Sequence, residues 1–176
     1  MSFLAVFICY IDRVNISVAI IPMQEQFGWS ETQTGIIFSI FYIGYVLTMI
    51  LGGILADKYG GKTVLGVGVL LWSIFTILTP FFAYNGFLAL LFIRVLIGLG
   101  EGITFPSWHS LYARWIPFNE RTRSIAITNS GISAGTIFGY VVAALIIPSY
   151  SWEWVFYSFR SEEHTSELQS PMYLVC

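Results

Sequence analysis

Five apolar stretches dominate the sequence, and each is long enough to cross a membrane as a helix. They cover residues 2–24, 33–55, 62–83, 86–113 and 124–147. The hydrocarbon core of a bilayer is about 30 Å thick, and roughly 20 helical residues span it. A chain in lipid must satisfy its own backbone hydrogen bonds, which an α-helix does within one segment. We therefore predict an all-α membrane protein.

The composition supports this class. Of the 176 residues, 56% are hydrophobic and 10% are charged, whereas soluble domains contain about 25% charged residues. The net charge is -2 without a long basic run, which argues against nucleic acid and leaves the lipid bilayer as the expected partner. Cys9 and Cys176 form neither a disulfide framework nor a metal site, and no cluster of catalytic side chains accompanies His109. We expect neither an enzyme nor a cofactor.

The basic residues of the predicted loops indicate the orientation. All of them fall in two loops, 57–62 and 114–123: Lys58, Lys62, Arg114, Arg121 and Arg123. Short cytoplasmic loops contain an excess of Lys and Arg. We therefore predict that these two loops and the N-terminus are cytoplasmic.

A sixth apolar segment begins at Trp152 and stops at Phe159. The next eleven residues, RSEEHTSELQS, contain one apolar residue and cannot continue a membrane helix. The same eleven residues are the in-frame translation of a common sequencing adapter. We therefore expect residues 160–176 to be a non-native tail and the functional part of the chain to be 1–159, the alternative being a natural polar loop.

Four charged residues lie inside predicted spans: Asp12, Arg13, Arg94 and Glu101. Each costs about 2.5 to 3.5 kcal/mol at the centre of a membrane helix, so each needs a partner or water. Arg94 and Glu101 are seven residues apart, which places them on one helix face about 10 Å apart along the axis. Pairs such as Asp12 with Arg94 and Arg13 with Glu101 are plausible. Such groups usually mark an ion or substrate path; the alternative is that they only pack against one another.

Small residues give a second signal. A repeat on the span 124–147 predicts close approach by another helix: Gly131, Gly135 and Gly139. Three glycines and one proline predict a bend or a cavity wall in the span 86–113: Gly98, Gly100, Gly102 and Pro106. Four indole rings near the predicted membrane edges are expected to be interfacial anchors: Trp108, Trp115, Trp152 and Trp154.

Four motifs then indicate a family. The segment GILADKYGGK at 53–62 resembles the cytoplasmic signature of the major facilitator superfamily, and RVLIGLG at 94–100 resembles its fourth-helix signature, RxxxGxG. The segments YIDRVNISVAI at 10–20 and GEGITFPSWHSLYARWIPFNERTR at 100–123 resemble the anion:cation symporter branch. That branch includes sugar-acid symporters and phosphate, sialic-acid and vesicular glutamate transporters. The resemblance covers nearly all of 1–159.

The resemblance implies the N-terminal six-helix half of a twelve-helix transporter, with five helices complete and the sixth truncated. It implies symport of an organic or phosphate anion with protons or sodium by alternating access, with the missing C-terminal half as the partner that completes the site. Two alternatives remain: a transporter of another substrate class in the same superfamily, and a non-transporting receptor or scaffold.

The resemblance also assigns roles to residues at matching positions. Asp12 and Glu101 match the protonatable carboxylates, Arg13 and Arg94 match cations that organise the coupling network or attract the anion, and Asn15 and Tyr45 match or neighbour cavity positions. The cytoplasmic motif is expected to be a gating latch through Gly53, Asp57, Lys58, Gly60 and Lys62. Gly61 departs from the superfamily pattern, which often has a basic residue there.

Overall fold

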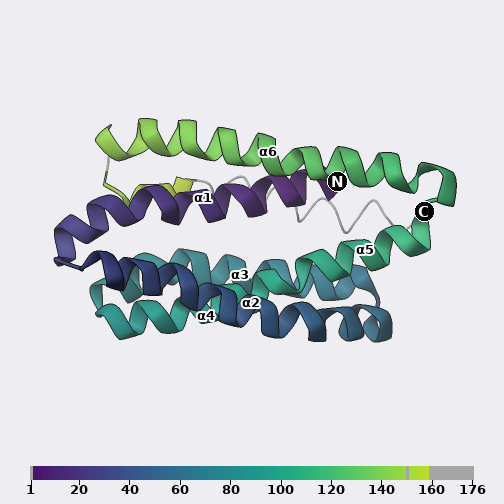
Figure 1. The fold of residues 1–176 in the computed structure, drawn as a ribbon, viewed down its shortest axis with the longest axis horizontal. Helices are drawn as coiled ribbons and strands as arrows, with labels where there is room; N and C mark the ends of the chain where they lie inside the picture. The colour runs from purple at the N-terminus through teal and green to yellow at the C-terminus, as the bar shows by residue number, and fades with distance from the viewer. Residues whose placement is uncertain (1, 150, 159–176) are drawn as a thin grey trace. The chain divides into compact units, whose positions relative to one another are not determined.

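The structure is a computed structural model that describes residues 2–149 and 151–158 (Figure 1). Within this part, the chain forms helices α1 (Ser2–Phe27), α2 (Glu31–Tyr59), α3 (Gly61–Tyr84), α4 (Phe87–Gly102), α5 (Thr104–Trp115), α6 (Phe118–Ser149) and α7 (Glu153–Ser158). Five spans are long and apolar enough to cross a membrane, with α4 and α5 together forming one of them. The predicted all-α membrane protein with five complete spans is confirmed. The predicted tail, 160–176, lies outside the described residues.

The helices form two compact units that are not continuous along the chain. One unit contains α1, most of α6 and α7, and the other runs from Ser30 to Arg121, from α2 to the first residues of α6. The first unit therefore joins segments from the two ends of the described chain. Each unit is described separately below.

In the unit Ser30–Arg121, α4 packs against both α2 and α3 and approaches both at glycines. A Cβ atom added to Gly98 would overlap the carbonyl oxygen of Phe41 on α2, and one added to Gly102 would overlap that of Tyr45. On the other side, a Cβ added to Gly100 would lie 2.9 Å from Trp72 of α3. These glycines permit backbone contact that any larger side chain would prevent.

The expected small-residue ridge of α6 is found, and its partner is α1. A Cβ added to Gly131 would lie 2.8 Å from the carbonyl oxygen of Phe3, and one added to Gly139 would lie 3.2 Å from Val14. Gly135 likewise faces the carbonyl oxygen of Phe7. A buried hydrophobic cluster also joins α1, α6 and the short α7: Ile11, Ala143 and Val155.

Helices extend further into the polar segments than hydropathy indicates. Helix α2 continues through Lys58, and α6 begins at Phe118 and includes Arg121 and Arg123. Hydropathy marks the part of a helix that lipid tolerates, whereas backbone hydrogen bonding continues into charged turns. The start of α2 is fixed by a capping box, in which Ser30 Oγ accepts from Gln33 N at 3.3 Å and Gln33 Oε1 accepts from Ser30 N at 2.9 Å.

The span Phe87–Trp115 is broken at Ile103, where α4 ends and α5 begins. Pro106 contributes to the break because it has no N–H to donate to the carbonyl of Gly102. The irregularity expected in this span is found as this break, whereas the alternatives of a bend and a cavity wall stay predictions. The glycines before the break were expected to make the helix irregular. Instead, they are the points at which α4 contacts α2 and α3 closely.

Candidate functional site

Arg94 and Glu101 are buried on one face of α4. Their exposed fractions are 6% and 2%, and their seven-residue spacing returns the helix to within about 20° of the same direction. A cation and a carboxylate are thus both withdrawn from the surface of a membrane helix, which is costly unless the surrounding groups or a ligand compensate.

The crossing of α2 and α4 brings the backbone of Tyr45 to the stretch of α4 that contains Glu101. Gly98 and Gly102 flank Glu101 in sequence, and both face the backbone of Tyr45: a Cβ on Gly98 would lie 3.0 Å from Tyr45 N, and one on Gly102 would overlap its carbonyl oxygen. The Tyr45 ring is partly buried and stacks on Phe41 with 5.9 Å between centroids. Two residues expected in the site are therefore brought to the same helix crossing.

The other predicted site residues lie on α1, in the other unit. Asp12 and Arg13 are partly buried, and the Arg13 guanidinium lies 5.0 Å from the centroid of the Tyr10 ring, within cation–π range. Asn15 is fully buried at 0% exposure, and neither polar atom of its side chain has a hydrogen-bond partner among the described residues. The pairs Asp12 with Arg94 and Arg13 with Glu101 each join the two units and stay predictions.

Residues of the cytoplasmic motif meet α5 at one end of the unit Ser30–Arg121. Ser110 Oγ donates to Asp57 Oδ1 at 3.2 Å, and Arg114 Nη2 donates to the Asp57 carbonyl oxygen at 3.0 Å. Arg121 Nη2 donates to the carbonyl oxygen of Ala113 at 3.0 Å. The loops predicted at 57–62 and 114–123 therefore lie at the same end of this unit.

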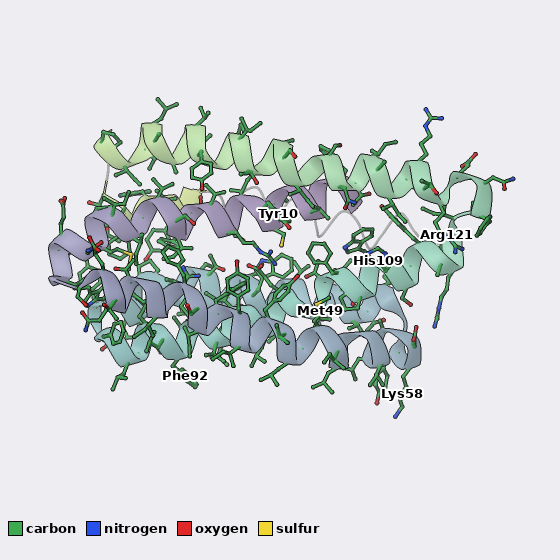
Figure 2. All side chains as sticks on the ribbon, viewed as in Figure 1. Tyr10, Met49, Lys58, Phe92, His109 and Arg121 are labelled. Carbon is green, nitrogen blue, oxygen red and sulfur yellow. The ribbon has the colours of Figure 1, made fainter. Side chains whose placement is uncertain are left out.

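The glycines of the motif have distinct structural roles. Gly60 links α2 to α3 with φ = 88°, a left-handed conformation that favours glycine. A Cβ atom added to Gly53 would lie 3.8 Å from the Cβ of Pro106 on α5, an ordinary van der Waals contact. Gly61, where the superfamily often has a basic residue, leaves only 2.6 Å between an added Cβ and the carbonyl oxygen of Ser107. The close approach of α3 to α5 thus accounts for glycine at 61. Lys58 and Lys62 are exposed, and Lys58 extends away from the end of α2 (Figure 2).

Comparison with known sequences decides the family. The profile described as Major Facilitator Superfamily matches residues 2–159. The chain belongs to the major facilitator superfamily. A bacterial homologue of the human lysosomal transporter Spinster, solved in an inward-facing and occupied conformation, has the same fold, with a TM-score of 0.80 over 95% of this chain and 41% of that one at 24% identity. The predicted family is therefore confirmed.

Similar members of the superfamily are plant chloroplast proteins named for anion transport. The chain is 46% identical to probable anion transporter 4 of Oryza sativa subsp. japonica, 45% identical to the ascorbate transporter of Arabidopsis thaliana, and 45% identical to sodium-dependent phosphate transport protein 1 of the same plant. Each match covers 92% of this chain and 27 to 31% of the relative. The chain thus spans about three tenths of the length of these transporters.

In this superfamily member, two tryptophans lie in other surroundings than predicted, and one residue that contacts the cytoplasmic motif was not predicted. Trp108 and Trp152 are not interfacial, with exposed fractions of 2% and 4%, whereas Trp115 is 75% exposed. Trp152 Nε1 donates to Gln26 Oε1 at 2.7 Å, which ties α7 to the end of α1. Ser110, the partner of Asp57, was missed because its only sequence signal is a place one helical turn before Arg114.

Proposed function

We propose that this chain is the N-terminal half of a secondary active transporter that moves an organic or phosphate anion together with protons or sodium by alternating access. The observation that carries the proposal is the burial of Arg94 and Glu101 on one face of α4. Buried ionisable groups in membrane helices mark ion and substrate paths. The relatives named as anion, phosphate and ascorbate transporters support the substrate class.

The roles of the charges follow from their chemistry. Arg94 and Arg13 are permanent cations whose planar guanidinium groups suit carboxylate and phosphate oxygens. Glu101 and Asp12 are the groups that can exchange a proton or bind sodium while the anion is held. Asn15, buried in one unit, and Tyr45, at the crossing of α2 and α4 in the other, are the neutral residues proposed to line the cavity. The C-terminal half supplies the opposing wall, because such transporters bind substrate between their two halves.

The cluster at Asp57 is the proposed gating latch. Ser110 and Arg114 hold the last turn of α2 against α5 through one side-chain and one backbone oxygen of Asp57. Lys58 and Lys62 remain at the surface, where charged groups can meet a neighbouring helix end when the transporter changes state. We propose that this end of the unit is cytoplasmic, as the basic loops indicate.

Uptake by the full-length protein tests the function. Purified protein in proteoliposomes is given radiolabelled phosphate or ascorbate under an inward proton gradient, an inward sodium gradient, or neither. We expect accumulation above the external concentration of at least one anion under one ion gradient. Vesicles containing an unrelated membrane protein are the control. Absence of gradient-driven accumulation for a panel of phosphate and carboxylate anions would rule out the proposed symport, and transport of a cationic or neutral substrate would favour another substrate class.

A further inference from the structure

The face of α4 that carries Arg94 and Glu101 continues onto α5. Trp108 follows Glu101 by the same seven-residue step that separates Glu101 from Arg94, and Thr104 lies one turn before Trp108. Ile103 at the break keeps right-handed helical angles, φ = -71° and ψ = -24°, so α5 stays close to the phase of α4. The four side chains therefore form one stripe along the span Phe87–Trp115.

Thr104 differs from six other hydroxyl residues of the spans. Each of these six donates to the carbonyl oxygen four residues back in its own helix, at 2.7 to 3.2 Å: Ser17, Ser39, Thr48, Thr79, Ser107 and Thr136. Thr104 is 2% exposed, and its buried hydroxyl oxygen has no hydrogen-bond partner among the described residues. The carbonyl four residues back belongs to Gly100, which lies before the break and faces Gly68 of α3. The break thus releases this hydroxyl from its own helix.

Trp108 is a second buried donor one turn further on. Its exposed fraction is 2%, and its Nε1 has no hydrogen-bond partner in the described part of the chain. The ring stacks on His109 with 4.0 Å between centroids, and it also lies 5.9 Å from the Phe105 centroid and 5.1 Å from that of Tyr112. By contrast, the equally buried Trp152 has its acceptor in Gln26. A buried indole N–H without an acceptor is costly, because indole can only donate.

We propose that the Thr104 hydroxyl and the Trp108 indole N–H bind an oxygen of the transported oxyanion, a carboxylate or a phosphate, on the α5 side of Glu101. This inference rests on the proposed function and adds a subsite to it. Residues four apart on a helix have Cβ atoms about 5 to 6 Å apart, so one anionic group can accept from both. An oxyanion fits because the indole N–H can only donate and the hydroxyl can donate as well, so both can give a hydrogen bond to its oxygen atoms. The Arg94 guanidinium supplies charge on the same face.

The test compares variants that remove one donor and keep the shape. In the full-length protein, Thr104→Val removes the hydroxyl, Thr104→Ser keeps it, and Trp108→Phe removes the indole N–H. Thr79→Val is the matched control, because Thr79 is 1% exposed and its hydroxyl already donates to Phe75. The readouts are kcat and KM for radiolabelled phosphate or ascorbate, whichever the parent transports, and equilibrium binding of that anion to detergent-purified protein.

We expect Thr104→Val and Trp108→Phe each to raise KM and the dissociation constant about tenfold, since each removes a hydrogen bond to a charged group. Thr104→Ser and Thr79→Val should stay within about twofold of the parent. Unchanged affinity in Thr104→Val and Trp108→Phe, or a fall in kcat alone, overturns the subsite and assigns these donors to water or packing. If Trp108→Phe does not fold, the Val and Ser variants of Thr104 decide the question. A parent that transports no anion refutes the proposed function instead.

Discussion

Ser110 on α5 donates a 3.2 Å hydrogen bond to the carboxylate of Asp57 on α2, although the two residues are 53 positions apart. Arg114 donates to the backbone carbonyl of the same aspartate at 3.0 Å. The last carbonyl groups of a helix have no partners within it, so Arg114 satisfies one of them from outside. The end of α2 is therefore attached to α5 by polar contacts at the surface, which can exchange with water or other partners.

Removal of Arg114 should destabilise the protein more than removal of Ser110. Arg114→Ala leaves a C-terminal carbonyl of α2 without its cationic donor, and we expect a loss of about 1 kcal/mol. Both bonds are exposed, and we expect less for Ser110→Ala because its 3.2 Å bond is longer than the 3.0 Å bond of Arg114 and its donor is neutral. Thermal unfolding of the full-length protein, followed by size-exclusion chromatography, measures the change. Arg123→Ala removes an exposed cation from α6 as the control. An equal loss in that control would argue against a specific cap at Asp57.

Alanine at Gly98 should force α2 and α4 apart. The new methyl group would overlap the carbonyl oxygen of Phe41, and we expect a loss of about 1 to 3 kcal/mol in stability. Gly66→Ala is the matched control, because Gly66 lies in α3 with no atom within 4 Å of an added Cβ. Helical alanine is favoured over glycine by up to about 1 kcal/mol, so the control should be neutral or stabilising. The same melting assay applies, and equal behaviour of the two variants would contradict the close crossing.

The contact between Trp152 and Gln26 should show a measurable coupling. Trp152→Phe and Gln26→Ala each remove the 2.7 Å hydrogen bond, and a double-mutant cycle should give an interaction free energy of about 1 kcal/mol. Trp115→Phe, at a ring that is 75% exposed, should change stability little. Additive effects of the two single substitutions would mean that this hydrogen bond does not stabilise the contact of α7 with α1.

Substitutions of Glu101 and of Arg94 should impair different steps of transport. Glu101→Gln keeps the shape and mimics the protonated carboxyl group, so we expect it to abolish uphill accumulation more than exchange. Arg94→Ala should impair both accumulation and exchange, because it removes the buried cation of the proposed anion site. Arg94→Lys should rescue poorly, since an ammonium group does not reproduce the guanidinium fork. Uptake and counterflow in proteoliposomes separate these outcomes. Uphill accumulation by Glu101→Gln equal to that of the parent would limit Glu101 to a packing role.

The orientation can be tested with single cysteines at exposed positions in a Cys-free background. Thr63 and Asn119 are exposed at the end where α2 meets α3 and α5 meets α6, and Thr32 is exposed at the opposite end of α2. Gly61 is unsuitable because any side chain there would strike Ser107. An impermeant thiol reagent applied to intact cells should label Thr32→Cys alone. Labelling of Thr63→Cys or Asn119→Cys from outside would reverse the proposed topology.

The spans were predictable because lipid imposes a simple requirement of length and apolarity. The shared face of Arg94 and Glu101 was also predictable, since helical periodicity alone fixes it. The family followed from motifs that the comparisons confirm. The ridge of α6 was expected from glycine spacing, although its partner, α1, could not be named.

Other features depend on how helices cross, and sequence does not encode the crossing in a local pattern. Gly98 and Gly102 were expected to make α4 irregular, whereas they allow it to pack closely against the backbone of Phe41 and Tyr45. Trp108 was expected at a membrane edge from its place in the sequence, but the ring is buried, with an exposed fraction of 2%. The free hydroxyl of Thr104 follows from the break at Ile103, and hydropathy cannot show which polar atoms lack an acceptor.

The discontinuous unit formed by α1, α6 and α7 has a consequence for biogenesis. The sequence Ser30–Arg121 separates α1 from α6, and at about 5 to 20 residues per second the ribosome needs roughly 5 to 18 s to make it. During that interval α1 has left the ribosome with Asp12 and Arg13 while the glycine ridge that seats it does not yet exist. We therefore expect α1 to need an escort during insertion, such as the translocon or an insertase, until α6 arrives.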